Sequence, residues 1–561
     1  MLTPPVFLLL ASLQFAVGAL VAACFQSWHL VIFPSLTGPL LGALFLSEES
    51  IELPISLRNQ TSVFLCSILL LLPAFGFIYT SMRTPRAGDL DLARFAGRHV
   101  CVEAQVDSIL PQRSSKNVRL ICSVKNAGNR FRGRFSVEKC DGATLLFIHR
   151  NAPWLDKLSR KARFRCSVRV ASLSDFESNG RRGYAVYLQR LGITSLCYLE
   201  RGGYFSLLPQ ESSLSLVSRI CETFCDFIEV QRSRLIAAHI SNLGTEIGSL
   251  LAAMVLGERA VGVNEELLAS FRSVGLSHVL AASGFNLTIV TLSTHWVCRT
   301  LGLSAIPRNC LSFVMMAVFV AFAGNSSSVV RASLMCALAI GCSSLGRRVH
   351  IAGLLGAALF ISIIVDPLSV ADPGFQLSYT AVSGIIFIVS PVSELLKLSV
   401  SRGWLRLVLE CLATVFVAQA CVLPLQLFYF KQVGMLFLPA NLLASLVVTP
   451  VTVAGFASSL VVLLCPAGTM ISGPILLLAT LLDWFASLPL KVLVWAVSLL
   501  SSCRWAVLSF PEIGAWVVFL YYLVFILISV RLLKYVQSFQ KAQANSRMVA
   551  ALENRENEKR D

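Results

Sequence analysis

Long runs of apolar residues recur along the chain. Clear examples cover residues 7–24, 63–79 and 516–530. A helix of about 20 apolar residues matches a hydrocarbon core about 30 Å thick. Because hydrocarbon offers the backbone no hydrogen-bond partner, each run must satisfy its own amides, which favours helices. The pattern predicts a polytopic α-helical membrane protein.

Between the first apolar runs and the later ones, the pattern changes to a two-residue alternation. Apolar and polar residues alternate over residues 99–106, 144–149, 164–170 and 184–189. Such alternation is typical of half-buried strands. A series of short strands predicts a small barrel or sandwich. An OB-like β-barrel, a fold that binds oligonucleotides, is one candidate.

These patterns divide the chain into five predicted segments. We expect about three transmembrane helices in 1–82, the OB-like domain in 83–203, an amphipathic interfacial helix in 204–245, a transmembrane domain in 246–534 and a polar tail in 535–561. The N-terminal helices are expected near 5–25, 28–47 and 62–81. The apolar run 247–256 is too short to span a bilayer and is expected to be re-entrant or interfacial.

Composition and charge add a second feature to this division. Only 14% of the residues are charged, against about a quarter in soluble proteins. The net charge of +16 is uneven, because residues 83–201 hold 23 Lys and Arg but 10 Asp and Glu, a local charge of +13. A basic block of this kind favours a polyanion or an anionic membrane surface as partner. A solvated basic domain without such a partner is the alternative.

Basic residues also orient the chain. In the C-terminal half, the loops near 299–308, 347–348 and 397–406 and the segment 531–541 are rich in Lys and Arg, and the loops between them are poor. The positive-inside rule places the basic loops in the cytoplasm. Both termini are then cytoplasmic, and the OB-like domain is extracytoplasmic.

Cysteines and catalytic motifs limit the chemistry that the chain can carry. Five of the 17 cysteines lie in the basic block: Cys101, Cys122, Cys140, Cys166 and Cys197. If this block is extracytoplasmic, one or two disulfides can form. The chain has no CxxC pair and no HExxH or GxxxxGK[ST] motif. We therefore predict no metal, no cofactor and no enzymatic activity.

Polar residues inside apolar segments are costly in a membrane and therefore point to function. Arg331 lies just inside an apolar run and could line a route for an anion, or it could reach out to the membrane interface. His278 could relay a proton, although an isolated histidine is more often simply hydrogen-bonded. Asp372 precedes Pro373 and could instead cap a helix.

Several motifs occur in a characteristic order. They are Val255-Leu-Gly-Glu-Arg259, the run FRSVGLSHVLAASG at 271–284, Ser328-Val-Val-Arg-Ala332, Asp366-Pro367 and the run DPGFQLS at 372–378. On these residues the chain resembles the ComEC family of competence proteins, over about residues 215–510. N-terminal helices followed by an OB-like domain also match the family layout.

The resemblance implies a channel that passes one DNA strand across a bacterial inner membrane during natural transformation. Expected partners are single-stranded DNA, an external DNA receptor, a cytoplasmic helicase-type ATPase, single-strand-binding proteins and the lipid bilayer, with the oligomeric state left open. By motif, the implied channel residues are Gly275, Ser277, His278, Ser283, Arg331, Asp372 and Gln376. Three small or polar residues in apolar surroundings join them: Gly284, Asn286 and Gln419. The DNA-binding candidates of the basic domain are Arg130, Arg132, Arg134, Lys161, Arg163 and Arg165.

Two departures from the family pattern change what the resemblance implies. Family members usually read Ser-Gly-Leu-His where this chain reads Ser283-Gly-Phe-Asn286. Many members also carry a C-terminal metallo-β-lactamase-like domain, thought to degrade the strand that is not imported, and this sequence has a charged tail there. We expect another protein to degrade that strand.

Three other functions stay open from the sequence. A secondary transporter of a small anion would use Arg331. A membrane-embedded hydrolase would use Ser283, His278 and an Asp. A DNA-binding membrane anchor would need the basic domain and no pore.

Overall fold

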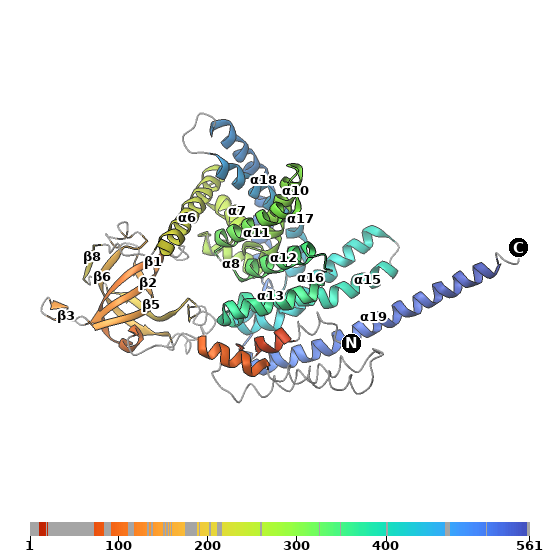
Figure 1. Cartoon of the computed structure of the whole chain (residues 1–561), viewed down its shortest axis with the longest axis horizontal. Coiled ribbons are helices and arrows are strands. Elements are labelled where there is room, and N and C mark those ends of the chain that lie inside the picture. Colours follow the sequence, from red (N-terminus) through yellow and green to blue (C-terminus); the bar gives the residue numbers. More distant parts are fainter. Residues whose placement is uncertain are drawn as a thin grey trace. The chain divides into compact units, whose positions relative to one another are not determined.

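A computed structural model shows a mostly helical chain interrupted by one β-domain (Figure 1). The structure describes residues 11–17, 19–20, 72–83, 91–109, 117–128, 130–131, 134–135, 138–149, 152, 155, 158, 160–173, 188–189, 191–200, 204–209, 216–258, 261–324, 326–347, 349–399, 402–465, 472–511 and 513–557. The chain divides into two compact units. The first comprises Met1–Arg272, Leu276–Phe375 and Ala444–Ser498, and the second comprises Ser273–Gly275, Gln376–Leu443 and Leu499–Asp561.

The N-terminal segment is described in part. Residues 11–20, apart from 18, and residues 72–83 are helical. Residues 11–20 lie within the helix predicted near 5–25, and residues 72–83 overlap the helix predicted near 62–81. The helix predicted near 28–47 lies outside the described residues.

The basic segment forms a small closed barrel. In the described part its strands are β1 (His99–Ile109), β2 (Asn117–Gly128), β5 (Glu138–His149), β6 (Arg163–Ser172) and β7 (Ile193–Leu199). They pair in the order β1-β2-β5-β7-β6, and β6 pairs back with β1 to close the ring. The β5–β7 pair is parallel and the other pairs are antiparallel. The OB-like barrel is therefore confirmed, and the sandwich alternative is not formed.

The barrel interior follows the alternation seen in the sequence. The buried residues of β1 and β6 include Val100, Val102, Ala104, Val106, Phe164, Cys166, Val168 and Val170. Strands predicted at 99–106, 144–149 and 164–170 are confirmed. A strand was also predicted at 184–189. Only residues 188–189 of it are described, and they form a helical turn; residues 184–187 lie outside the described residues.

The five cysteines of the barrel are all free and buried. The disulfides that the sequence left open are therefore not formed. Desolvation of the thiolate raises the pKa of Cys197 to about 12 and also raises the pKa of Cys122 and Cys166. These thiols act as small apolar side chains of the core.

Helices make up most of the remaining described chain. In order they are α6 (Leu216–Leu243), α7 (Thr245–Leu256), α8 (Glu265–Ser273), α9 (Ser277–Leu280), α10 (Gly284–Thr300), α11 (Ala305–Phe322), α12 (Ser327–Ser344), α13 (Ile351–Val365), α14 (Pro373–Gly384), α15 (Ser390–Ser399), α16 (Gly403–Phe430), α17 (Phe437–Leu464), α18 (Ser472–Ser501) and α19 (Ala515–Asn557). Among the described residues, seven helical segments are long and apolar enough to cross a membrane: Ala305–Phe322, Ser327–Ser344, Pro373–Lys397, Gly403–Phe430, Phe437–Leu464, Gly473–Ser501 and Ala515–Val536. The chain is a polytopic α-helical membrane protein, as predicted.

Helix α7 lies in the core of the first unit. All of residues 248–256 are buried. Gly244 (φ +82°) turns the chain between α6 and α7. A Cβ at Gly248 would lie 2.4 Å from the carbonyl oxygen of His239, so the two helices approach closely only because this residue lacks a side chain. Whether α7 is a re-entrant or an interfacial segment stays a prediction.

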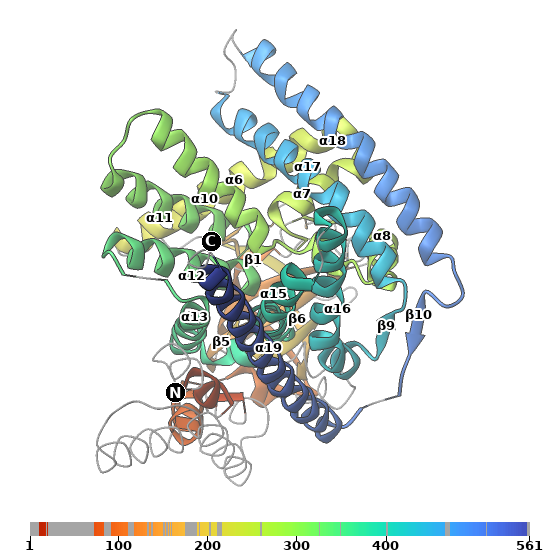
Figure 2. The same ribbon diagram turned by 90° about the vertical axis from the view of Figure 1, so that its right-hand side faces the viewer.

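The second unit contains a short two-stranded sheet and a proline-interrupted helix. Figure 2 shows β9 (Gln432–Gly434) and β10 (Val507–Ser509) side by side, and they pair in antiparallel fashion. Helix α16 contains Pro424 in its interior. Helix α19 continues to Asn557, so most of the predicted polar tail is helical.

Candidate functional site

Asn286 joins α10 to the end of α7. Its side chain is 3% exposed, and Nδ2 donates to the carbonyl oxygen of Met254 over 2.7 Å. The last carbonyls of a helix have no partner within the helix, so this amide satisfies one of them. Ser283 Oγ donates to Asn286 Oδ1 over 3.1 Å and holds the amide in place. The polar pair Ser283–Asn286 therefore connects the two motif segments.

Two glycines allow the motif segments to touch. A Cβ at Gly257, whose φ is +96°, would lie 2.8 Å from Ala282 Cβ. A Cβ at Gly284 would lie 3.1 Å from Ala332 Cβ on α12. Small residues at these points permit close backbone approach between helices. The N-terminal ends of α10 and α12 and the C-terminal end of α7 thus meet in the first unit.

Arg331 lies on α12 beside this meeting point. The next residue, Ala332, is buried and packs against Gly284. The Arg331 side chain is half-buried, and Nη1 lies 3.8 Å from Met335 Sδ one turn along the helix. The structure therefore places the α12 backbone at Arg331 next to a residue that packs against Gly284, although the two segments are far apart in sequence.

Ser277 and His278 lie on the short helix α9. Both residues are exposed, whereas Leu280 of the same helix is buried. The Ser283 hydroxyl donates its proton to Asn286. The hydroxyl is therefore not poised for activation by a base, and the hydrolase alternative gains no support from this geometry.

Asp372 caps a helix. It is 3% exposed, and its Oδ1 accepts a hydrogen bond of 3.0 Å from the backbone N–H of Gly374 in the first turn of α14. A carboxylate at this position satisfies a free N–H group and complements the helix dipole. The capping interpretation of Asp372 is confirmed.

The remaining channel candidates lie in the second unit. Gly275 has φ +81°, and a Cβ there would lie 3.1 Å from Phe437 Cβ, so glycine is required by conformation and by packing. Gln376 Oε1 accepts from the Tyr429 hydroxyl over 3.0 Å. Gln419 Nε2 donates to Gln426 Oε1 over 2.9 Å. Uncharged amide and hydroxyl groups are thus gathered on α14 and α16.

The basic candidates of the barrel fall into two groups. Arg163 lies 3.0 Å and Arg165 lies 3.6 Å from carboxylate oxygens of Glu103. Their side chains are only 12% and 29% exposed. The two cations share this one carboxylate, and the closer pair is with Arg163. Lys161 has φ +68° in the turn before β6.

The second group lies on a separate hairpin. Arg130 and Arg134 belong to β3 (Arg130–Phe131) and β4 (Arg134–Phe135), which pair with each other. Arg132 lies between these strands and outside the described residues. This hairpin is a two-stranded sheet distinct from the barrel ring.

One buried polar cluster was not predicted from the sequence. His239 on α6 and Asp483 on α18 are 1% and 0% exposed and lie 3.0 Å apart. The signal available was Asp483 itself, an acidic residue in the apolar run 472–501. Its partner could not be recognised, because the two residues are 244 positions apart.

Comparison with known families places these residues in context. The Competence protein family matches residues 254–535. The chain belongs to the competence protein family. It is 27% identical over 212 residues to ComE operon protein 3 of Bacillus subtilis (strain 168), covering 38% of this chain and 26% of that protein. The chain thus matches about a quarter of the length of this relative. No solved structure matches.

The family match separates the candidates by position. All the channel candidates, from Gly275 to Gln419, lie within the competence-family region. The barrel and α6 precede it, so their roles rest on the structure and on charge. Of the buried pair, Asp483 lies inside the family region and His239 lies before it.

Proposed function

We propose that the chain is an inner-membrane channel that imports single-stranded DNA during natural transformation. The competence-family match across the membrane helices carries this proposal. Two further features support it: the basic segment folds as a small closed barrel, and polar side chains gather within each unit of the membrane part. OB-like barrels bind oligonucleotides on one face.

The candidate channel residues are consistent with a polyanion that binds weakly enough to keep moving through the channel. In the first unit the half-buried cation Arg331 is the chain neighbour of Ala332, which packs against Gly284. In the second unit Gln376 and Gln419 offer uncharged amides. Conduction requires binding strong enough for entry and weak enough for exit. One cation with neutral polar groups meets this requirement better than a cluster of cations.

DNA capture is assigned to the hairpin of the barrel. Residues 130–135 read Arg-Phe-Arg-Gly-Arg-Phe, which alternates cations with rings. Cations bind phosphates and aromatic rings stack on bases, the combination used for single strands. Arg163 and Arg165 are assigned a structural role, because Glu103 already pairs with both.

Energy for import comes from another protein in this proposal. The sequence contains no GxxxxGK[ST] motif, so a cytoplasmic helicase-type ATPase is the proposed motor, with single-strand-binding proteins receiving the strand. An external receptor delivers DNA to the extracytoplasmic barrel. Both termini are proposed to be cytoplasmic, in accord with the basic loops of the C-terminal half.

The test is uptake of labelled DNA into a nuclease-protected pool. We compare wild type, a deletion strain and the deletion carrying Arg331→Ala or Arg331→Lys at equal protein level. Deletion should abolish internalisation while surface-bound DNA persists. Arg331→Ala should reduce internalisation about tenfold, the effect of losing roughly 1.4 kcal/mol from one charge-assisted contact. Arg331→Lys should retain more activity.

Arg299→Ala is the matched control, since it removes an exposed cation from the last turn of α10. It should leave uptake unchanged. Normal internalisation in the deletion strain would overturn the proposal and favour an anion transporter. DNA held at the surface of wild-type cells without internalisation would favour an anchor without a pore.

A further inference from the structure

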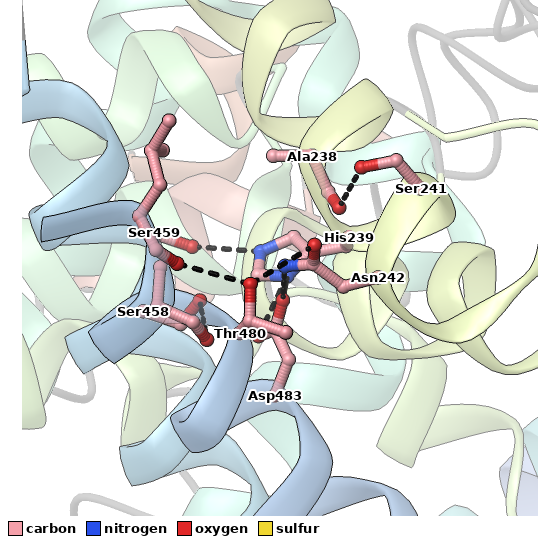
Figure 3. Close-up of polar contacts among 10 residues, drawn as sticks. Ala238, His239, Ser241, Asn242, Ser458, Ser459, Thr480 and Asp483 are labelled. Atoms are coloured by element: carbon pink, nitrogen blue, oxygen red, sulfur yellow. Dashed lines mark hydrogen bonds and ion pairs between the residues drawn. The ribbon is translucent and has the colours of Figure 1, made fainter. Parts of the chain in front are cut away.

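Three helices of the first unit bury a connected polar cluster. His239 on α6, Ser459 on α17 and Asp483 on α18 are 1%, 4% and 0% exposed. His239 Nδ1 lies 3.0 and 3.1 Å from the two Asp483 carboxylate oxygens, and Nε2 lies 3.0 Å from Ser459 Oγ. Figure 3 shows these side chains pointing toward one another from separate helices. Both nitrogens of the imidazole are therefore engaged.

The cluster continues outward through amide and hydroxyl groups. Asn242 Nδ2 donates to Asp483 Oδ2 over 2.7 Å, and Thr480 Oγ1 lies 3.3 Å from Asn242 Oδ1 (Figure 3). Asn242 and Thr480 are only partly buried. A chain of hydrogen bonds thus connects the buried carboxylate to a less buried part of α6 and α18.

The order serine, histidine, aspartate also occurs in hydrolases, but the surroundings differ here. Ser459 lies within α17, where the neighbouring backbone N–H groups bond to the helix's own carbonyls. A hydrolase needs free N–H donors at the reacting carbonyl and access for a substrate. With Ser459 only 4% exposed, neither condition is met. The cluster is therefore not a nucleophile site.

The charge of the pair depends on one proton. With a single proton shared between His239 and Asp483 the pair is neutral, and without it the pair carries one negative charge. An uncompensated buried charge is costly in surroundings of low polarity.

Charged groups on the neighbouring elements are few. Helix α17 contains no charged residue. Besides Asp483, α18 carries Lys491, α7 carries the exposed Glu246 and α11 carries Arg308. Where the side chains of α6 are described, its charged residues are Asp226, Glu229, Arg232 and Arg234. Arg234 donates to a backbone carbonyl at the end of α17 and Arg232 to carbonyls of α11, so both have other partners.

We propose that His239 and Asp483 form a proton-binding site inside the first unit, and that its proton occupancy sets the packing of α6 against α17 and α18. With the proton bound, the neutral pair keeps the three helices together. Loss of the proton leaves a buried negative charge, which favours water entry and release of α6. This proposal does not depend on the proposed role in DNA import.

Two spectroscopic signals test proton binding. The full chain is labelled with ¹⁵N-histidine in lipid nanodiscs, and the pH is raised from about 5 to about 9. Of the seven histidines, the His239 signal is identified by its loss in His239→Gln, or by its displacement in Ser459→Ala if the first variant does not fold. A carboxylic-acid infrared band assigned by Asp483→Asn reports a proton on the carboxyl. We expect the pair to hold one proton at low pH and to lose it as the pH rises.

His295 is an internal control, because its Nδ1 also lies 2.9 Å from a serine hydroxyl, that of Ser312. The His295 signal should be the same in wild type and in Asp483→Asn at each pH, whereas the His239 signal should differ between the two proteins. Identical His239 titration in both proteins would overturn the proposal. So would a pair whose protonation does not change over the whole range.

Amide hydrogen exchange over residues 238–243 tests the link to packing. After correction for the intrinsic pH dependence, exchange in wild type should rise with pH as α6 loosens. Asp483→Asn removes the negative charge that the site would carry at high pH and should suppress that rise. An equal rise in both proteins would show that proton occupancy does not control α6.

Discussion

Single residues decide how the competence motifs pack. Asn286 stands 32 positions from Met254, and its buried amide satisfies a carbonyl at the end of α7. The residue is therefore a structural connection between α7 and α10. The sequence shows that Asn286 is a polar residue in an apolar run, but it does not show that the carbonyl of Met254 is its partner.

Replacing the donor should destabilise the first unit. Asn286→Ala leaves a buried carbonyl without its partner and should lower the free energy of unfolding by about 1–3 kcal/mol. Asn286→Asp, of the same size, places an acceptor against an acceptor and should cost more. Denaturant unfolding of detergent-solubilised protein measures both. An Asp variant as stable as wild type would show that the Nδ2 bond does not matter.

Two glycines separate backbone strain from steric clash. At Gly302 (φ +71°) an added Cβ would have no other atom within 4 Å, whereas at Gly257 (φ +96°) it would meet Ala282. Gly302→Ala should cost about 1 kcal/mol from backbone strain alone. Gly257→Ala should cost about 3 kcal/mol or more, because strain and overpacking add. Thermal unfolding of the two variants compares them, and equal losses would contradict the packing of this loop.

At the scale of elements, helix α16 shows how a break in one helix is compensated by another. Pro424 has no N–H group, so the carbonyl of Ala420 loses its helical partner. The Tyr521 hydroxyl of α19 donates to that carbonyl over 2.8 Å, and the Tyr522 hydroxyl donates to the carbonyl of Cys421 over 2.8 Å. In hydrocarbon surroundings a freed carbonyl needs such a donor. The second unit therefore depends on the α16–α19 contact.

Removing the Tyr521 hydroxyl tests this compensation. Tyr521→Phe should lower the free energy of unfolding by about 1–3 kcal/mol, since a carbonyl that has no helical partner loses its donor. In a Pro424→Ala background, which restores the backbone N–H, the same change should cost less. Tyr535→Phe, on the same helix but 62% exposed, is the matched control and should have little effect. A loss from Tyr521→Phe that is unchanged by Pro424→Ala would contradict the assignment.

For the whole molecule, the separation of charge from hydrophobicity matters most. The excess of basic residues lies in the barrel segment, and the seven apolar segments of the described chain follow it. Within the barrel, Arg163 and Arg165 both pair with one carboxylate, that of Glu103. The count of 23 Lys and Arg in residues 83–201 therefore overstates the number of cations available to a polyanion.

Salt dependence of DNA binding measures how many cations are available. Changing Arg130, Arg132 and Arg134 together to Gln should weaken single-strand binding by the full chain. It should also reduce the slope of log K against log salt by about 2, at roughly 0.7 for each phosphate contact. Arg163→Gln should leave the slope nearly unchanged, because that cation already has a carboxylate partner. An equal change of slope in Arg163→Gln would reverse the assignment of the two groups.

The sequence by itself determined the properties that depend on local pattern. Apolar length indicated the membrane helices, alternation in β1, β5 and β6 indicated the barrel, and the ordered motifs from Val255 to Ser378 indicated the family. These properties were readable because helix and strand periods repeat within a few residues, and because each motif is contiguous. The capping role of Asp372 belongs here too, since its partner, Gly374, is two residues away.

Only the tertiary structure decided which polar groups are partners. Asp483 meets His239 across 244 positions, Arg163 meets Glu103 across 60, and Asn286 meets a carbonyl of α7 across 32. No period in the chain encodes such pairs, because they depend on which helix faces or strands pack together. The sequence does not distinguish an arginine that is available to DNA from an arginine that already pairs with a carboxylate. The fold distinguishes them by burial and by distance to a carboxylate.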